Sequence, residues 1–315
     1  MEKDEKISVV SVILILIIVG LGCYIVYDKV MDNNINNNEN ANENSKNNNI
    51  ASYDCYYEGE VVDGSTYVNG QYTYTYKGST SSGISNGWEI NLTDKESTEP
   101  VTSKICNSVN GRSIISAFYM FDGSKATSID LSSFDTSNVV EMGYMFSDSS
   151  ATEIKGLDKF NTSKVYDMEG MFMHCKNFTI LDLSSFDTSN VVDMSAMFMG
   201  FSAVEIKGLD KFNTSKLEDA SLMFSGAELK KTLDLSNFDT SNLKTMYAMF
   251  SGFDIQTEIT ISNPDPWWWE NIFYGAATED DSKIIVNYTS ETESIVDSML
   301  KTKSANSNVI KGVQK

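Results

Sequence analysis

The sequence has one histidine, His174, and far fewer basic than acidic residues. A lone histidine argues against most hydrolases and metalloenzymes, which combine several imidazole, carboxylate or thiol groups. With 24 Lys and Arg against 44 Asp and Glu, the formal net charge is −20, which argues against a nucleic-acid partner because phosphates require basic surfaces. The four cysteines, at positions 23, 55, 106 and 175, do not have the spacing of a zinc site. We therefore expect neither an enzyme nor a metal or cofactor site.

The first 50 residues predict a membrane anchor followed by a flexible linker. Residues 7–27 form an uncharged, mainly apolar stretch that as a helix would span about 30 Å of hydrocarbon. Lysines before this stretch favour an N-terminus inside the cell, so residues 1–30 would be a cytoplasmic stub and a single transmembrane helix. Residues 31–50 are rich in asparagine and are expected to be disordered, with the rest of the chain extracellular. The alternative is a lipoprotein attached through Cys23.

Residues 114–276 repeat with a period of 26 residues. A phenylalanine and a leucine return at fixed positions in five successive units, and each unit ends in a Met-Phe pair. The phenylalanines are Phe134, Phe160, Phe186, Phe212 and Phe238, and the leucines are Leu131, Leu157, Leu183, Leu209 and Leu235. A fixed period of this length is typical of a solenoid, in which each unit buries its apolar face against its neighbours. These columns are therefore the predicted core.

Each repeat combines two kinds of periodicity. Ile129 and Leu131 alternate as in a short strand, whereas Val139, Met142 and Met145 are spaced like one face of a short helix. The fold class predicted is an α/β repeat solenoid of the leucine-rich-repeat type, with an all-β solenoid as the alternative. Residues 51–113, which are rich in tyrosine and alternating polarity, predict a small β-rich N-terminal cap. Residues 277–315 predict a C-terminal cap made of a strand and a helix.

The sequence pattern of the repeat also resembles that of a known family. The stretch LDLSSFDTSNVVDMSAMF (181–198) resembles the repeat of the BspA-type leucine-rich-repeat surface proteins of bacteria. This repeat is also known as a Mycoplasma-lipoprotein-associated domain of unknown function, and the resemblance covers about residues 114–276. It implies a cell-surface location and a role in adhesion or partner contact, and it brings no catalytic residues.

Two versions of the repeat alternate along the solenoid. One contains Asp-Leu-Ser (130–132, 182–184 and 234–236), and the other contains Lys-Gly-Leu (155–157 and 207–209). Because adjacent units lie about 4.8 Å apart, the alternation separates like charges that would otherwise face each other on every unit. Duplication of a 52-residue block is the alternative explanation. One column is an exception to the alternation, since it is acidic on four successive units: Glu141, Asp167, Asp193 and Asp219.

The remaining candidates for function lie at the ends of the solenoid. Trp267, Trp268 and Trp269 stand between two prolines and an altered Met-Phe pair, where they either close the end of the core or form a partner contact. Cys55 and Cys106 both lie in the N-terminal cap and are candidates for a disulfide. The predicted function is adhesion to a protein or glycan of a host or neighbouring cell. A non-binding spacer of the cell envelope is the alternative.

Overall fold

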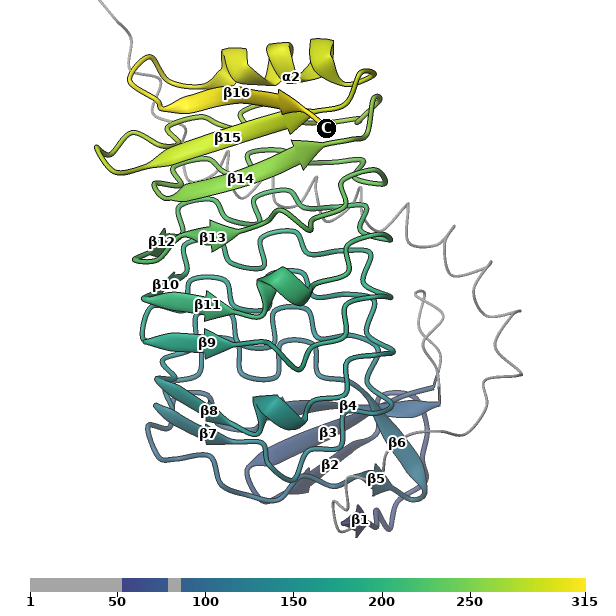
Figure 1. Cartoon of the computed structure of the whole chain (residues 1–315). Coiled ribbons are helices and arrows are strands. Elements are labelled where there is room, and N and C mark those ends of the chain that lie inside the picture. The colour runs from purple at the N-terminus through teal and green to yellow at the C-terminus, as the bar shows by residue number, and fades with distance from the viewer. Residues whose placement is uncertain (1–52, 79–85) are drawn as a thin grey trace, which may run out of the picture.

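A computed structural model describes residues 53–78 and 86–315 (Figure 1). The predicted membrane span at 7–27, the linker at 31–50 and Cys23 lie outside the described residues. Within the described part of the chain, no helix is long and apolar enough to cross a membrane.

The repeats wind into a β-solenoid of about nine turns, called coils here (Figure 1). One side of the solenoid carries short parallel strands that lie above one another in chain order (Figure 1). They are β7 (Ser128–Asp130), β8 (Glu153–Lys155), β9 (Ile180–Asp182), β11 (Glu205–Lys207), β13 (Leu233–Asp234), β14 (Gln256–Ile261) and β15 (Lys283–Tyr288). A further parallel pair is formed by β10 (Ser202–Ala203) and β12 (Glu228–Leu229). The predicted solenoid is therefore confirmed, and its all-β form fits the structure.

The prediction of a short helix in each repeat is wrong, because this segment consists of turns. In the segment after Val139, the amide of Met145 donates to the carbonyl of Met142 (3.2 Å), but the amide of Met142 donates to Asp167 of the next coil (3.0 Å). An α-helix would use its amides within its own segment. The left-handed backbone of Tyr144 (φ 54°) also interrupts any helix, because a non-glycine residue in this conformation does not continue a right-handed turn. The segment is a succession of tight turns that hydrogen-bond to the next coil.

The predicted core columns are confirmed. All ten phenylalanine and leucine side chains are at most 7% exposed. The phenylalanines of the Met-Phe pairs form a second column, in which successive rings stack with centroids 5.4–6.1 Å apart. This stack runs through Phe121, Phe146, Phe172, Phe198, Phe224, Phe250 and Phe273. Burial of this much aromatic surface against adjacent coils is the main favourable term for the solenoid.

A buried threonine joins each repeat to the next one. Thr162 Oγ1 accepts the amide of Asp187 (2.8 Å) and donates to the carbonyl of the same residue (2.9 Å). The first four threonines of the repeated Thr-Ser pair make the same two bonds to a single residue, whereas Thr240 Oγ1 donates to the carbonyl of Thr260 and accepts the amide of Ser262 (2.8 Å each). All five threonines are at most 2% exposed. The column consists of Thr136, Thr162, Thr188, Thr214 and Thr240. The hydroxyl thus satisfies backbone groups at a place where no strand pairing is available.

Both ends of the solenoid are covered. The N-terminal end carries a six-stranded sheet in the order β1 (Asp54–Cys55), β5 (Ser108–Val109), β6 (Arg112–Ser116), β4 (Gly87–Leu92), β3 (Tyr72–Lys77) and β2 (Thr66–Asn69). Cys55 and Cys106 form a disulfide at its edge, with Cα atoms 5.6 Å apart. At the other end, helix α2 (Glu293–Met299) and the short η4 (Leu300–Thr302) lie over the last strand, β16 (Val309–Gln314) (Figure 1). Coverage of this kind removes the exposed apolar ends that a solenoid would otherwise have.

Candidate functional site

The strand sheet of the solenoid is interrupted twice, and then continues without a break through β13, β14, β15 and β16. β8 pairs only with β7, and β9 pairs only with β11, so no ladder joins β8 to β9. The same interruption recurs between β11 and β13. Each pair of strands therefore combines one coil with Asp-Leu-Ser (a DLS coil) and the following coil with Lys-Gly-Leu (a KGL coil).

Glycine determines which neighbour a KGL coil contacts. Gly156 has a left-handed backbone (φ 91°), and a Cβ atom placed there would lie 2.6 Å from the backbone nitrogen of Ser132. The KGL coil therefore packs against the backbone of the DLS coil before it, which no other residue type would allow. It then makes a 3-10 turn, η2 (Leu157–Lys159), which has no counterpart in the DLS coils. Lys164 Nζ adds a hydrogen bond back to Asn138 Oδ1 (2.9 Å). Besides separating like charges, the alternation of the two repeat versions thus places a glycine where the KGL coil packs closely against the DLS coil.

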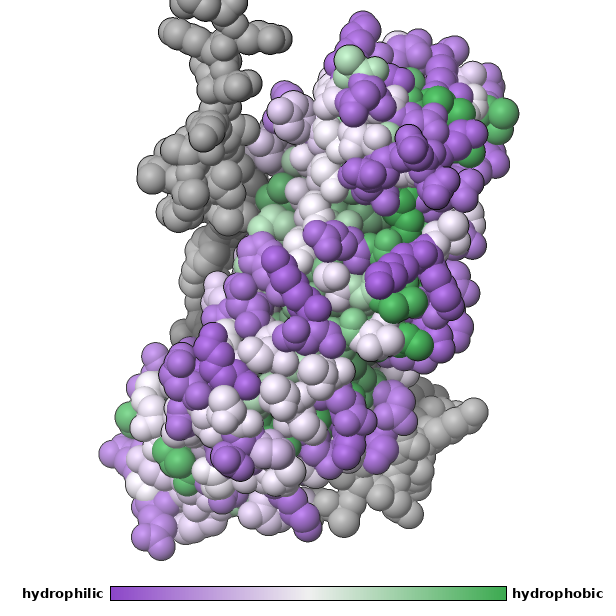
Figure 2. All heavy atoms as spheres, turned by 90° about the vertical axis from the view of Figure 1, so that its left-hand side faces the viewer, coloured by the Kyte–Doolittle hydropathy of each residue, from purple (hydrophilic) through white to green (hydrophobic). Residues whose placement is uncertain are grey.

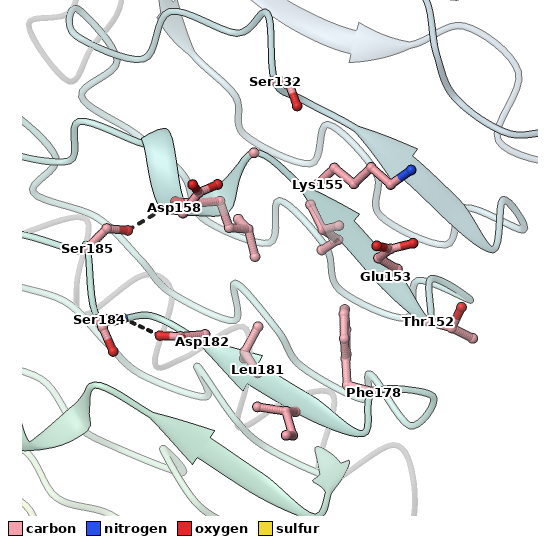
Figure 3. A pocket seen from close by; sticks show the side chains of 14 residues that line it. Ser132, Thr152, Glu153, Lys155, Asp158, Phe178, Leu181, Asp182, Ser184 and Ser185 are labelled. Atoms are coloured by element: carbon pink, nitrogen blue, oxygen red, sulfur yellow. Dashed lines mark hydrogen bonds between the residues drawn. The ribbon is translucent and has the colours of Figure 1, made fainter. Parts of the chain in front are cut away.

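The first interruption opens a groove of about 740 Å³ between β8 and β9 (Figure 3). Its apolar lining comes from Ile154 and Leu157 on one side and from Phe178, Ile180 and Leu181 on the other. Ile180 is 47% exposed, which is unusual for an isoleucine in a strand. Charged groups border the groove: Glu153, Lys155, Asp158 and Asp182. Apolar surface between hydrophilic borders is also visible along the middle of the rod when it is seen from the side (Figure 2).

The second interruption, 52 residues further on, is bridged by backbone and side-chain groups. The amides of Lys230 and Lys231 both donate to the carbonyl of Val204 (3.2 Å each), and the described first interruption has no equivalent of these bonds. Lys231 Nζ forms an ion pair with Glu205 (2.6 Å), and Asn237 Nδ2 donates to the carbonyl of Asp210 (2.9 Å). In the first interruption the residue equivalent to Lys231 is Thr179, and the residue equivalent to Asn237 is a serine, Ser185. The groove was not predicted from the sequence. The signal that could have found it is that two nearly identical blocks differ at these bridging positions.

The three tryptophans have different environments. Trp267 is 65% exposed, and the ammonium of Lys244 lies 5.1 Å from its ring centroid. Trp268 stacks on Tyr247 with ring centroids 4.4 Å apart, and Trp269 packs against the core while remaining partly buried. One tryptophan is thus available to a partner, and the other two contribute to the end of the solenoid. We call Trp267 and Trp268 with Tyr247 the aromatic edge.

The acidic column lies under the surface and does not point into open solvent. Glu141, Asp167, Asp193 and Asp219 are joined by successive parallel bridges, so they form a carboxyl ladder across four coils. Asp193 and Asp219 are only 7% and 8% exposed. Asp193 Oδ1 accepts both the amide and the hydroxyl of Ser195 (2.7 Å each), which holds the carboxyl in place. Within the described residues, no basic side chain forms an ion pair with Asp167 or Asp193.

Burial and nearby carboxylates raise the pKa of Glu141, Asp167 and Asp193. Burial raises the pKa of Glu141 to about 7. Burial and the neighbouring carboxylate of Asp193 hold the pKa of Asp167 well above its usual range, and burial with the charge of Asp219 does the same for Asp193. Glu169, whose carboxyl accepts a short hydrogen bond from Tyr144, has its pKa raised to about 8 by burial and by Asp167.

Two further groups of chemically reactive side chains, the adjacent His174 and Cys175 and the aspartates of the repeated Phe-Asp-Thr (FDT) turns, do not form a site. Cys175 is buried, and burial raises the pKa of its thiol to about 12, whereas the ring of His174 lies at the surface 3.3 Å from Asp148. The adjacent side chains therefore point apart and do not form a catalytic pair. The repeated aspartates of the FDT turns cap the backbone, as Asp187 Oδ1 does for the amide of Ser189 (3.0 Å). In residues 53–78 and 86–315, no group of three or more metal-binding side chains is arranged to hold an ion.

Sequence comparisons place the repeats in a family. No curated protein and no solved structure shows significant similarity to the chain. A family model described as "Mycoplasma protein of unknown function, DUF285" matches residues 96–180 and 146–263, which together cover more than half of the chain. The chain therefore belongs to the DUF285 family of Mycoplasma proteins of unknown function.

Proposed function

We propose that the protein is a membrane-anchored bacterial surface protein whose extracellular solenoid binds a protein or glycan partner through the aromatic edge. The observation that carries this proposal is the 65% exposure of Trp267 at one end of a rigid rod. Tryptophan is the residue type most enriched at binding hot spots, and its flat face also packs on sugar rings. The likeness of the repeat to BspA-type surface proteins supports the same role.

The composition of the described surface supports binding over catalysis. Most of the large aromatic side chains of the repeats lie in the two interior columns, so few aromatic side chains remain on the surface to contact a partner. Trp267 and Tyr274 are the most exposed aromatic side chains of the last repeat, at 65% and 59%. A flat, exposed ring beside a lysine suits a partner with polar groups around an apolar patch, such as a pyranose ring or an aromatic-rich protein surface.

The test compares tryptophan variants of the full chain on arrays of matrix proteins and cell-wall glycans. Trp267→Ala should keep the melting temperature, because the side chain is mostly in solvent, and should lose binding. Trp269→Ala is the matched control, since loss of a packed ring should lower the melting temperature. If the unaltered chain binds nothing on these arrays, the alternative of a non-binding spacer is favoured.

The membrane topology needs its own experiment. External protease added to intact cells should remove residues after about 50 and leave the span at 7–27 in the membrane fraction. Complete protection of the solenoid from protease would contradict an extracellular location.

A further inference from the structure

We propose that the groove between β8 and β9 binds an extended peptide segment that carries alternating basic and apolar side chains. This site is separate from the aromatic edge and does not depend on the function proposed for it. Three features of the groove favour this occupant: its unpaired strand edges, the charge of its border, and its contrast with the second interruption.

Unpaired backbone groups face the groove from both sides. The amide of Leu131 donates to the carbonyl of Lys155 (2.9 Å), so the backbone groups of Lys155 point to β7. Because these directions alternate along a strand, the N–H and C=O of Ile154 point the other way, into the groove. The amide of Leu183 donates to Lys207 (3.0 Å), and by the same alternation the groups of Ile180 and Asp182 point into the groove.

No backbone hydrogen bond of the described chain connects these facing groups to one another. Exposed strand edges of this kind are the surface that an extended peptide uses when it adds to a sheet. Its main chain supplies hydrogen bonds, while alternate side chains enter pockets on the surface. Here the pockets are apolar, because Ile154, Phe178 and the half-exposed Ile180 line the groove. The volume of about 740 Å³ is within the usual range for a ligand groove.

The border of the groove favours a cationic occupant. Among the residues that line the groove, Glu153, Asp158 and Asp182 supply three carboxylates and Lys155 supplies one ammonium, and all four side chains are exposed. Complementary charge at an exposed border accelerates association and selects among partners. A peptide with basic side chains on one face and apolar side chains on the other fits both the border and the floor.

The second interruption shows how this protein closes such a groove. There Lys231 pairs with Glu205 (2.6 Å), and Asn237 donates across the gap to Asp210 and to Phe212. Among the residues that line the first groove, the hydroxyl of Ser185 donates across it to the carbonyl of Leu157 (3.1 Å; Figure 3), and beside the groove Asn177 Nδ2 donates to the carbonyl of Ser150 (3.2 Å). The equivalent positions, Thr179 and Ser185, are too short to copy the second set of bridges. The open groove is therefore a local property of one interruption and is not imposed by the repeat.

The test uses the full chain and a fluorescently labelled peptide, acetyl-KVKVK-amide, with acetyl-EVEVE-amide as the charge-reversed probe. The basic peptide should bind saturably with one site per chain and should slow hydrogen exchange at the amides of Ile154, Ile180 and Asp182. The double variant Thr179→Lys with Ser185→Asn copies the bridges of the second interruption and should weaken binding at least tenfold. Ser294→Lys, which adds the same charge on helix α2, should leave binding unchanged.

A reciprocal variant keeps the test decisive if the bridged protein folds poorly. Lys231→Thr with Asn237→Ser removes the side-chain bridges of the second interruption and leaves the backbone bonds to Val204, and it should add a second peptide site. The proposal is overturned if the basic peptide does not bind, if the acidic peptide binds equally well, or if neither double variant changes the affinity or the number of sites.

Discussion

The carboxyl ladder should make the protein less stable as the pH rises. In the folded state the pKa values of Glu141 and Glu169 are raised to about 7 and about 8, and those of Asp167 and Asp193 are also raised. A carboxyl whose folded pKa is above its unfolded value contributes stability that is complete below the unfolded pKa. That contribution is lost as the pH rises through the folded pKa. The free energy of unfolding should therefore fall between about pH 5 and pH 8.

The substitution Asp193→Asn isolates this effect. The asparagine carbonyl can still accept the amide and hydroxyl of Ser195, so the turn cap is kept while the charge is removed. Adjacent rungs lie about 4.8 Å apart, and two charges at that distance repel by roughly 3 kcal/mol at an effective dielectric constant near 20. Asp193→Asn should therefore raise the free energy of unfolding at pH 8 by on the order of 2–3 kcal/mol and change it little at pH 5.

Urea unfolding followed by circular dichroism at pH 5, 6, 7 and 8 measures the effect. Asp193→Ala is the matched control, because it removes both the charge and the cap and should cost about 1 kcal/mol or more at pH 5. If Asp193→Asn changes the free energy of unfolding equally at pH 5 and pH 8, charge repulsion in the ladder is not the cause. A protein that is more stable at pH 8 than at pH 5 would also contradict raised carboxyl pKa values in the folded state.

Three further predictions concern the repeat itself. Phe186→Ala, in the central part of the core, should cost about 3–5 kcal/mol in urea unfolding; a loss below about 1 kcal/mol would contradict a buried phenylalanine column. Gly156→Ala should lower the melting temperature clearly more than Gly226→Ala, since both glycines are left-handed but only the first Cβ would meet backbone; equal losses would remove the close approach as a cause. Changing Asn161 and Asn213 together to Asp should reduce stability more at low salt than at high salt, and a loss independent of salt would leave duplication as the explanation of the alternating charges.

The sequence allowed the solenoid and its core to be predicted. The Phe and Leu columns return every 26 residues, and a period of that length is satisfied by stacked coils that bury the same position each time. The prediction of a helix was wrong because the spacing of Val139, Met142 and Met145 also fits a series of consecutive turns. The backbone that decides between the two, such as the left-handed Tyr144, cannot be recognised from a tyrosine in the sequence.

The groove and the buried carboxyls could not be predicted from the sequence. The groove depends on the contact between Gly156 and the backbone near Ser132, which joins residues that are far apart in the chain. The acidic ladder was visible as a column, but a column does not indicate whether it faces solvent. Asp193 is covered because its carboxyl folds back on Ser195, and that geometry becomes visible only in three dimensions.

Alternating repeat types build the coils in pairs and leave an unpaired boundary after β8. Residue-resolved hydrogen exchange of the full chain tests this pairing, because exchange reports whether a backbone amide is hydrogen-bonded. The amides of Leu131 and Leu183, which donate to Lys155 and Lys207, should exchange slowly. Those of Ile154 and Ile180 should exchange at least a hundredfold faster. Equal protection of all four amides would show a continuous sheet across this boundary and would contradict the paired arrangement of the coils.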